Sequence, residues 1–423
     1  MYISKLTIQN FRNIGVETTY NLNQKFTVFI GINGKGKSTI LHALRIACGT
    51  FFLGIPGIGR RHIQNHEIRL IESGKQLLPQ FPVKVEATGY FPESKLPVVW
   101  RRQRLLGSSS TTSNNADVGT VKKIAAEHYR KVMQEGNDTV GLPVIAYLGT
   151  SRVFASGRNT INSRVRLQRI GRKIFSEGYQ DWDEMKASKF HFNDWLNTYD
   201  VLVQIDKEYD RTKEAFLNAI KKANPYISDI IINNGEIWVK VKIDGNESSL
   251  LPLGLHSDGV HYFTAMVAEL AYRCIVLNGY LNEKAIIEST GIVMIDEIDL
   301  HLHPNWQRHV VNDLKEAFPQ IQFVVTTHSP FIVQSLESDE IWNLDKEMDV
   351  SPKKEKIDTI VTKIMGVSSA YSIENEDEYK KSKKFLSDLE QNKSSKELEE
   401  DLEDISDPAI RAFLELSKMT KGK

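Results

Sequence analysis

The chain has 423 residues, of which 41% are hydrophobic and 26% are charged, a composition typical of globular domains with a buried core. Lys plus Arg and Asp plus Glu number 54 each, so no overall charge excess would draw the chain to nucleic acid. The sequence has no run of about 18 apolar residues and no secretory start. We therefore expect no association with a membrane and a location in the cytoplasm.

Two strands at the start lead into a glycine-rich loop. Apolar and polar residues alternate from Ile3 to Phe11, and a second, continuous apolar run covers Phe26–Ile30. Residues 31–38 read Gly-Ile-Asn-Gly-Lys-Gly-Lys-Ser, which fits G-x-x-x-x-G-K-[ST], and residues 39–48 favour a helix. Strand, loop and helix in this order predict a P-loop, because its glycines let backbone N–H groups converge on phosphate oxygens.

The P-loop pattern assigns a role to each polar group along it. Lys37 is expected to reach the β- and γ-phosphates, and the Ser38 hydroxyl to bind Mg²⁺. The predicted nucleotide-binding residues of this segment are Asn33, Gly34, Lys35, Gly36, Lys37, Ser38 and Thr39. The sequence therefore predicts a site for ATP and Mg²⁺.

The middle of the chain predicts structure more than function. Residues 83–106 favour antiparallel strands, residues 142–148 a short apolar strand, and residues 181–224 helices with a buried apolar face. Asn233-Asn234-Gly235 lies between two strand patterns and predicts a hairpin turn. We expect residues 107–245 or so to form an insertion, a lid or helical subdomain.

A basic stretch runs through this insertion. Between Arg152 and Lys173 there are seven basic residues and no Asp or Glu: Arg152, Arg158, Arg164, Arg166, Arg169, Arg172 and Lys173. Such a stretch can neutralise the phosphates of nucleic acid. A solvated basic face, or a contact with the acidic C-terminal helices, accounts for it equally well.

Two adjacent carboxylates follow a buried strand near residue 295. The apolar run Gly291–Ile295 is typical of a strand covered on both faces of a parallel sheet, where ligands bind at the C-terminal ends of the strands. We expect Asp296 to hold Mg²⁺ and Glu297 to act as the general base toward the attacking water. Both are therefore candidate residues for nucleoside triphosphate hydrolysis.

Two further motifs take their meaning from their order in the chain. Ser257, Asp258 and Gly259 precede a predicted helix, residues 260–276, where backbone and hydroxyl donors can meet an anion. His328 ends a predicted strand, residues 321–326, and its imidazole N–H is suited to contact the γ-phosphate. Between these motifs, residues 306–317 favour a helix.

The last part of the chain changes in character. Residues 336–423 are rich in Lys, Glu and Asp with isolated leucines, which favours a charged helical appendage. Residues 1–335 then form the main domain. The sequence as a whole predicts an α/β fold with mixed parallel and antiparallel sheets.

The motif order resembles ABC-type ATPase heads of the SMC/Rad50/RecF kind. It consists of the P-loop, Ser257-Asp-Gly, Ile292-Val-Met-Ile-Asp-Glu-Ile-Asp-Leu-His-Leu-His-Pro and Thr326-Thr-His-Ser-Pro. It is similar in particular to the compact bacterial relatives of antiphage defence, the overcoming-lysogenization-defect ATPases and the PtuA ATPase of Septu systems. The opening Asn10-Phe-Arg-Asn also resembles that group, in which this segment lies near the nucleotide, so Arg12 and Asn13 become nucleotide-binding candidates.

The resemblance implies an ATP sandwich between two heads. The signature residues Ser257, Asp258 and Gly259 of one head would enclose the nucleotide bound to the P-loop of another, in a homodimer or higher homo-oligomer. Asp299 would contact the opposing head as the D-loop residue. The sequence departs from the usual signature at His256, and Gly149–Arg152 stands in for a Q-loop that has no obvious glutamine.

No nuclease constellation is visible in the sequence, so any cutting would belong to a separate effector chain. The Septu-like resemblance implies an HNH-type nuclease partner. We therefore expect an ATPase that is not itself a nuclease and that regulates an effector in antiphage defence. A RecF-like DNA-repair ATPase and a nucleotide-locked scaffold with negligible turnover remain alternatives.

Overall fold

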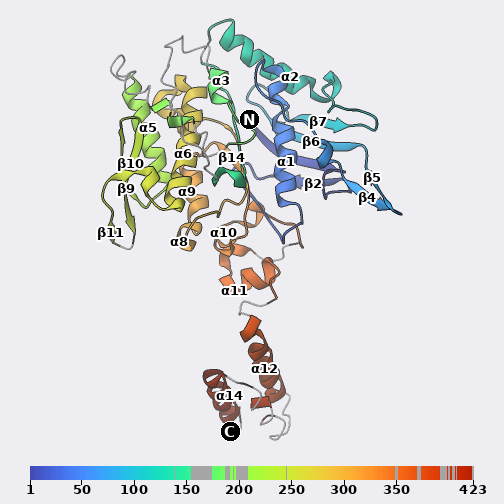
Figure 1. Cartoon of the computed structure of the whole chain (residues 1–423), viewed down its shortest axis with the longest axis vertical. Helices are drawn as coiled ribbons and strands as arrows, with labels where there is room; N and C mark the ends of the chain where they lie inside the picture. Colours follow the sequence, from blue (N-terminus) through green and yellow to red (C-terminus); the bar gives the residue numbers. More distant parts are fainter. Residues whose placement is uncertain are drawn as a thin grey trace. The chain divides into compact units, whose positions relative to one another are not determined.

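The computed structural model describes residues 1–137, 139–153, 174–185, 191–193, 195–196, 208–243, 245–347, 351–368, 373–390, 398, 401–402, 405 and 407–421. The chain divides into two compact units, Met1–Glu355 and Lys356–Lys423. Figure 1 shows the chain coloured along its sequence, with the elements labelled. The predicted functional motifs that the structure describes all lie in the first unit.

A five-stranded parallel sheet forms the centre of the first unit. Its strands, in spatial order, are β15 (Ile341–Asn343), β3 (Phe26–Ile30), β14 (Ile321–Thr326), β13 (Gly291–Ile295) and β8 (Val144–Leu148). Every residue of the four strands from β3 to β8 is buried. Their continuous apolar sequences follow from this, because a strand covered on both faces has no side chain directed to water.

The parallel direction brings the C-terminal ends of all five strands to one edge. The P-loop follows β3, Asp296 follows β13, Thr327 follows β14, and the segment Leu344–Asp345 follows β15. This edge is where ligands bind to parallel sheets. The strands predicted at residues 26–30, 291–295 and 321–326 are confirmed.

A second, antiparallel sheet lies on the other side of the P-loop helix α1 (Lys37–Cys48). Its strand order is β2 (Thr18–Asn21), β1 (Tyr2–Gln9), β6 (Val83–Tyr90) and β7 (Val98–Arg104). Helix α1 packs on β1, β6 and β7 and on β14, and its buried positions cover most of the helix. The Trp100 indole N–H donates to the Ala47 carbonyl across this contact, at 2.9 Å.

A third sheet contains the predicted hairpin. Strands β9 (Ile227–Asn233) and β10 (Glu236–Ile243) pair antiparallel, and the turn residues Asn234 and Gly235 both have positive φ, 50° and 74°. Those angles fit a type I′ turn, which is why Asn-Gly predicts hairpins well. Short strands β11 (Asn246–Glu247) and β12 (Leu251–Pro252) also pair with β10.

Helix α6 (Asp258–Leu277) is the longest of the described helices in the first unit and begins directly after the predicted signature serine. Among the described residues it alone is long and apolar enough to cross a membrane, yet 83% of its apolar window is buried inside the protein. It packs against α5 (Glu208–Ala223) and α3 (Ile174–Gly178). Its apolar sequence therefore matches that of a core helix.

The structure describes further helices and strands in the first unit. They are α2 (Asn115–Met133), α7 (Ala285–Glu288), α8 (Pro304–Gln307), α9 (Val310–Ala317), α10 (Pro330–Gln334), β4 (Leu70–Ser73) and β5 (Gln76–Pro79). The single helix predicted over residues 306–317 is split into α8 and α9. The break falls at His309, whose N–H donates to Trp306 O, a tighter connection than an α-helical bond.

The second unit has a small core of its own. Its described α-helices are α11 (Ile357–Thr359), α12 (Ile373–Glu390) and α14 (Pro408–Lys421). Helices α12 and α14 share a cluster of buried apolar side chains with the segment between them: Phe385, Leu389, Leu398, Leu402, Ile405 and Leu414. The isolated leucines of this charged sequence are thus largely core residues.

The expected domain limits differ from the two compact units. The first unit continues to Glu355 rather than ending at residue 335, because β15 pairs with β3 in the central sheet. The expected insertion at residues 107–245 is not separate from the core either, since it contributes β8 to the same sheet. Both differences arise from pairing between strands that are distant in sequence, which local patterns do not reveal.

Candidate nucleotide site

A cavity of about 280 Å³ lies at the C-terminal edge of the central sheet. Its lining residues are Arg12, Asn13, Asn33, Gly34, Gly36, Lys37, Ser38, Thr39, Asp296, Glu297, Thr326 and His328. Residues from four separate parts of the sequence thus meet in one place. All but Thr326 were predicted from sequence motifs.

The P-loop has the backbone conformation that its glycines permit. Gly34 and Gly36 have φ values of 87° and 103°, in the region that side chains disfavour. A Cβ on Gly36 would lie 2.9 Å from the Asn13 side-chain nitrogen, so this position also needs glycine for close packing. Helix α1 begins at Lys37 and directs its positive N-terminal end at the cavity.

Lys37 folds back over its own loop. Its ammonium group donates to the carbonyls of Gly31, at 2.7 Å, and Ile32, at 3.3 Å. Burial lowers the pKa of Lys37, and the carboxylates of Asp345 and Asp296, among others, oppose that shift. Phosphate oxygens would replace the two carbonyls with stronger, charge-assisted partners.

Ser38 and Asp296 form a pair of hard oxygen donors. The Ser38 hydroxyl donates to the Asp296 carboxylate at 3.1 Å, and the Thr326 hydroxyl donates to the same oxygen at 2.6 Å. Mg²⁺ is typically held by one or two protein oxygens together with waters and substrate phosphates, so this pair fits the ion. Thr326 was not predicted, although it opens the motif that contains His328.

Glu297 lies where the chain turns sharply away from β13. Its φ of 51° is unusual for a residue other than glycine, and its N–H donates to the Thr326 hydroxyl at 2.8 Å. This turn lets Asp296 and Glu297 face the same cavity, although neighbours along a strand point to opposite sides. Backbone strain of this kind is common at functional sites. His328 is exposed and lines the cavity from the end of β14.

Arg12 and Asn13 also line the cavity. Asn13 donates to the Gly34 carbonyl at 2.8 Å and accepts from the Thr39 hydroxyl at 2.9 Å, so it joins the P-loop at two points. Arg12 also has a positive φ, 51°, and its N–H donates to the Glu67 carbonyl at 2.7 Å. Among the described residues, its guanidinium forms no ion pair.

Asp345, which follows β15, contacts the P-loop. Sequence patterns did not predict this contact. Its carboxylate accepts from the Ile32 N–H at 2.7 Å and lies 3.7 Å from the Lys35 ammonium. Lys35, which was predicted to bind the nucleotide, is part of the loop but is not among the residues that line the cavity.

The predicted signature residues do not line this cavity. Ser257 and Asp258 are exposed at the start of α6, and the Ser257 side chain makes no capping hydrogen bond. His256, the departure from the usual signature, lies close to the Val239 carbonyl, with its Nε2 at 3.1 Å. An exposed position away from the cavity of the same chain is what a contact in trans requires.

Gly259 packs tightly against the loop that follows Glu297. A Cβ at this position would lie 2.4 Å from the His301 carbonyl, which leaves no room for any side chain. In the same loop, Asp299 accepts from the Thr327 hydroxyl at 2.6 Å. Signature and D-loop candidates are therefore neighbours within one chain.

Two predictions concern segments at or beyond the limits of the described residues. Residues 154–173, which carry most of the predicted basic stretch, lie outside them, and of the Q-loop candidate the structure describes Gly149–Arg152 without the Arg152 side chain. Within that loop, the Ser151 hydroxyl donates to Glu184 at 3.4 Å. Gly149, Thr150 and Ser151 are not among the residues that line the cavity.

The chain is similar to known proteins of retron and Septu systems and to a solved SMC head. The chain is 25% identical to the Retron Vc95 probable ATPase of Vibrio cholerae serotype O1 biovar El Tor, over 74% of this chain and 68% of that protein. It is 26% identical to the Septu protein PtuA of Bacillus mycoides (strain KBAB4), over 60% of this chain and 35% of that protein. A solved SMC head bound to the C-winged helix domain of ScpA aligns with a TM-score of 0.49 at 18% identity, over 81% of this chain and 94% of that one.

The chain spans about two thirds of the Vibrio relative and about a third of PtuA. The resemblance to ATPase heads of antiphage systems is confirmed by these retron and Septu relatives. Residues 5–248, more than half of the chain, match the AAA domain family. With its P-loop, acidic strand end and histidine meeting in one cavity, the chain belongs to the AAA domain family of P-loop ATPases.

Proposed function

We propose that the protein binds and hydrolyses ATP with Mg²⁺ and dimerises around the nucleotide, and so regulates a separate effector in antiphage defence in the cytoplasm. The observation that carries the ATPase part is the cavity in which Lys37, Ser38 and the carboxylates of Asp296 and Glu297 converge. The retron and Septu relatives support the defence part.

Each residue has a defined task in this proposal. Lys37 and the N–H groups of the P-loop bind the β- and γ-phosphates, while Ser38 and Asp296 hold Mg²⁺. Glu297 takes a proton from the attacking water, and His328 donates to the γ-phosphate from the neighbouring strand end. Mg²⁺ would supply charge neutralisation at the phosphates as they separate.

The dimer is part of the same proposal. Ser257 and Asp258 are exposed at the N-terminus of a 20-residue helix, where N–H donors remain for the γ-phosphate bound by a second copy. Asp299, in the adjacent loop, would contact the opposing head. The effector is proposed to be an HNH-type nuclease chain, and the basic stretch at residues 152–173 a contact for nucleic acid.

The test compares the purified protein alone with the protein co-expressed with the product of its neighbouring gene. Alone, it should hydrolyse ATP and leave DNA and RNA intact with Mg²⁺ or Mn²⁺ present. The complex should cut nucleic acid only with nucleotide bound. Nuclease activity of the repurified single chain would contradict the proposal, and ATP binding without measurable turnover would favour a nucleotide-locked scaffold.

A further inference from the structure

The loop that carries Arg12 and Asn13 is held by a second segment, Glu67–Arg69, which we call the clamp segment. The Arg12 N–H donates to the Glu67 carbonyl at 2.7 Å, and the Arg69 N–H donates to the Asn10 carbonyl at 3.0 Å. Between these two bonds, Phe11 and Ile68 form an antiparallel bridge. The clamp segment thus runs alongside the N-F-R-N loop as a miniature two-stranded ladder.

This contact holds an unfavourable backbone conformation. Asn10 and Arg12 both have positive φ, 52° and 51°, a region that is uncommon for residues other than glycine and less accessible to Arg than to Asn. The clamp segment bonds to the backbone of both residues. Arg69 adds a third contact, because its guanidinium donates to the Asn13 carbonyl at 2.5 Å and covers Gly15.

The clamp segment is itself fixed by a buried carboxylate. The Glu67 side chain is fully buried and accepts from the Gln64 N–H at 2.9 Å and from the Arg61 guanidinium at 2.5 Å. A buried, unpaired carboxylate is strongly unfavourable, so both oxygens are tied to their partners. The position of the Glu67 carbonyl, and with it the Arg12 backbone, follows from these two bonds.

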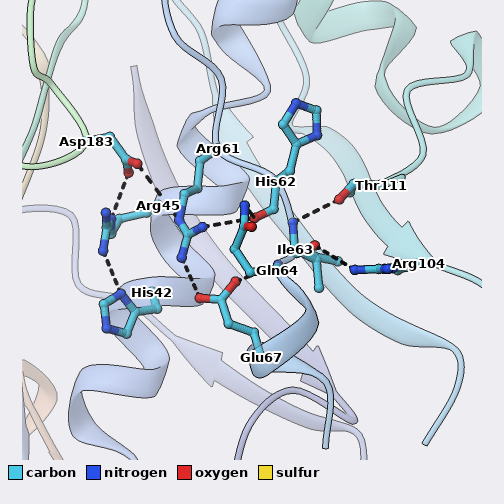
Figure 2. A network of polar contacts seen from close by, with 10 residues as sticks. All are labelled: His42, Arg45, Arg61, His62, Ile63, Gln64, Glu67, Arg104, Thr111 and Asp183. Atoms are coloured by element: carbon cyan, nitrogen blue, oxygen red, sulfur yellow. Dashed lines mark hydrogen bonds and ion pairs between the residues drawn. The ribbon is translucent and has the colours of Figure 1, made fainter. Parts of the chain in front are cut away.

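The same network reaches the P-loop helix. Figure 2 shows Arg61 between Glu67 and Asp183, with Asp183 also facing Arg45. Asp183 accepts from Arg45, on helix α1, at 2.7 Å and lies 3.9 Å from Arg61. Two carboxylates and two arginines therefore connect the clamp segment with the helix that follows the P-loop.

Arg12 is the end of this network that faces the cavity. Arg45 and Arg61 are both paired with carboxylates, whereas the Arg12 guanidinium forms no ion pair among the described residues. It lines the cavity in which the negative charge of a nucleotide would lie. An arginine left free in this way is suited to a phosphate.

We infer that Glu67, assisted by Arg69, is a positioning residue that holds Arg12 and Asn13 in place for the nucleotide. The inference rests on the proposed nucleotide-binding function. Glu67 itself does not touch the cavity and acts through the backbone of Arg12. Its loss should therefore weaken nucleotide binding more than it slows the chemical step.

The test is Glu67→Gln. The variant keeps the shape of the side chain, but its amide NH₂ group replaces one of the two oxygens that accept from Arg61 and from the Gln64 N–H. The Kd for ATP should rise about tenfold, as for a lost charge-assisted hydrogen bond, while kcat at saturating ATP stays within about twofold. In an Arg12→Ala background, Glu67→Gln should raise the Kd by clearly less than in the parent, because only the part that acts through Asn13 remains. Equal effects in both backgrounds would overturn the inference, since they would mean that Glu67 does not act through Arg12.

Glu269→Gln is the matched control. Glu269 is equally buried and pairs with Arg273, but it lies within α6, away from the clamp segment. This variant should lose thermal stability to a similar extent and keep the Kd for ATP of the parent protein. A Kd that rises as much as in Glu67→Gln would mean that any broken buried pair weakens binding, and would overturn the inference.

A nucleotide-free measurement separates this inference from the proposed function. Hydrogen exchange of the Arg12 amide should speed up in Glu67→Gln and stay unchanged in Glu269→Gln. Unchanged protection of Arg12 in the first variant overturns the positioning role, whether or not the protein binds ATP. If Glu67→Gln does not fold, Arg69→Met serves instead: it removes the donor to Asn13 on a more exposed side chain, and an unchanged Kd for ATP in that variant contradicts the inference.

Discussion

The carboxylate of Asp345 accepts a hydrogen bond from the backbone N–H of Ile32, and so ties the end of β15 to the first turn of the P-loop. Burial lowers the pKa of Lys37, and the negative charge of the same carboxylate partly offsets this decrease. Asp345 thus combines two effects on the nucleotide. It orders the loop, which favours binding, and it places a negative charge near the phosphates, which disfavours binding.

Two variants of Asp345 should separate these effects. Asp345→Asn keeps an acceptor for Ile32 and removes the charge, so the Kd for ATP should stay the same or fall. Asp345→Ala removes both and leaves the Ile32 N–H unpaired, which should raise the Kd about fivefold to tenfold. Calorimetric titration with a non-hydrolysed ATP analogue measures both, and weaker binding by the Asn than by the Ala variant would contradict this account.

Lys37→Ala should remove most nucleotide binding. Loss of a charge-assisted phosphate contact is worth on the order of 2–3 kcal/mol, or more than a tenfold rise in Kd. Lys35→Ala offers a comparison in the same loop, because its ammonium lies beside Asp345 and outside the cavity lining. Lys35→Ala should raise the Kd for ATP less than Lys37→Ala does. An ATP affinity of Lys37→Ala equal to that of the parent chain would refute the P-loop assignment.

Glu297→Gln should bind ATP normally and hydrolyse it about 10²–10⁴-fold more slowly, since an amide cannot accept the proton of the attacking water. The side chain keeps its shape, and the N–H bond to Thr326 is a backbone bond that the change leaves intact. ATP should then trap a dimer. Turnover at the parental rate, or a monomer with ATP bound in light scattering, would rule out this role.

The contact in trans is best tested at Ser257. Gly259 is unsuitable, because any side chain there would collide with the His301 carbonyl within its own chain. Ser257→Tyr places a bulky group on an exposed residue without a capping bond. It should inactivate the dimer but leave ATP binding intact. Mixed with Lys37→Ala, it should regain part of the activity, since one composite site is then complete in a mixed dimer. No recovery in mixed dimers shown to form would contradict the sandwich.

His42 gives a prediction for pH. Burial, reinforced by Arg12, Arg45 and Arg61, lowers the pKa of His42 from 6.5 to about 3, so its ring is neutral in the folded protein and can accept from Arg45. As pH falls below 6.5, the unfolded chain binds a proton that the folded chain does not, and stability decreases toward pH 3. In His42→Asn, which keeps an acceptor, the melting temperature should fall less between pH 7 and 5 than in the parent. Identical slopes would contradict the shift.

The sequence predicted those parts of the site that are local in the chain. The P-loop glycines, Lys37, Ser38 and the pair Asp296–Glu297 each follow a strand within a few residues, so pattern and spacing were sufficient. The continuous apolar runs before them also predicted buried parallel strands correctly. The residue types of these motifs are determined by the chemistry of phosphate and Mg²⁺ binding, so the motifs can be recognised without a structure.

The missing parts depend on strand neighbours. Asp345 reaches the P-loop because β15 lies next to β3, and Thr326 reaches Asp296 because β14 lies next to β13. Glu67 lies next to Arg12 because Ile68 forms a bridge with Phe11. None of these adjacencies leaves a local pattern, so no window of sequence could have predicted them.

The order of strands in the central sheet has a consequence for biosynthesis. Strand β3 is made early, but both of its neighbours, β14 and β15, lie near the end of the first unit. At ribosomal speed the wait is on the order of tens of seconds, during which an apolar strand has two unpaired edges. An unpaired apolar edge is a template for aggregation, so the nascent chain should depend on a holding chaperone until residue 343 has emerged. Any fragment that stops before β14 should accumulate as insoluble material, even though it contains the entire P-loop.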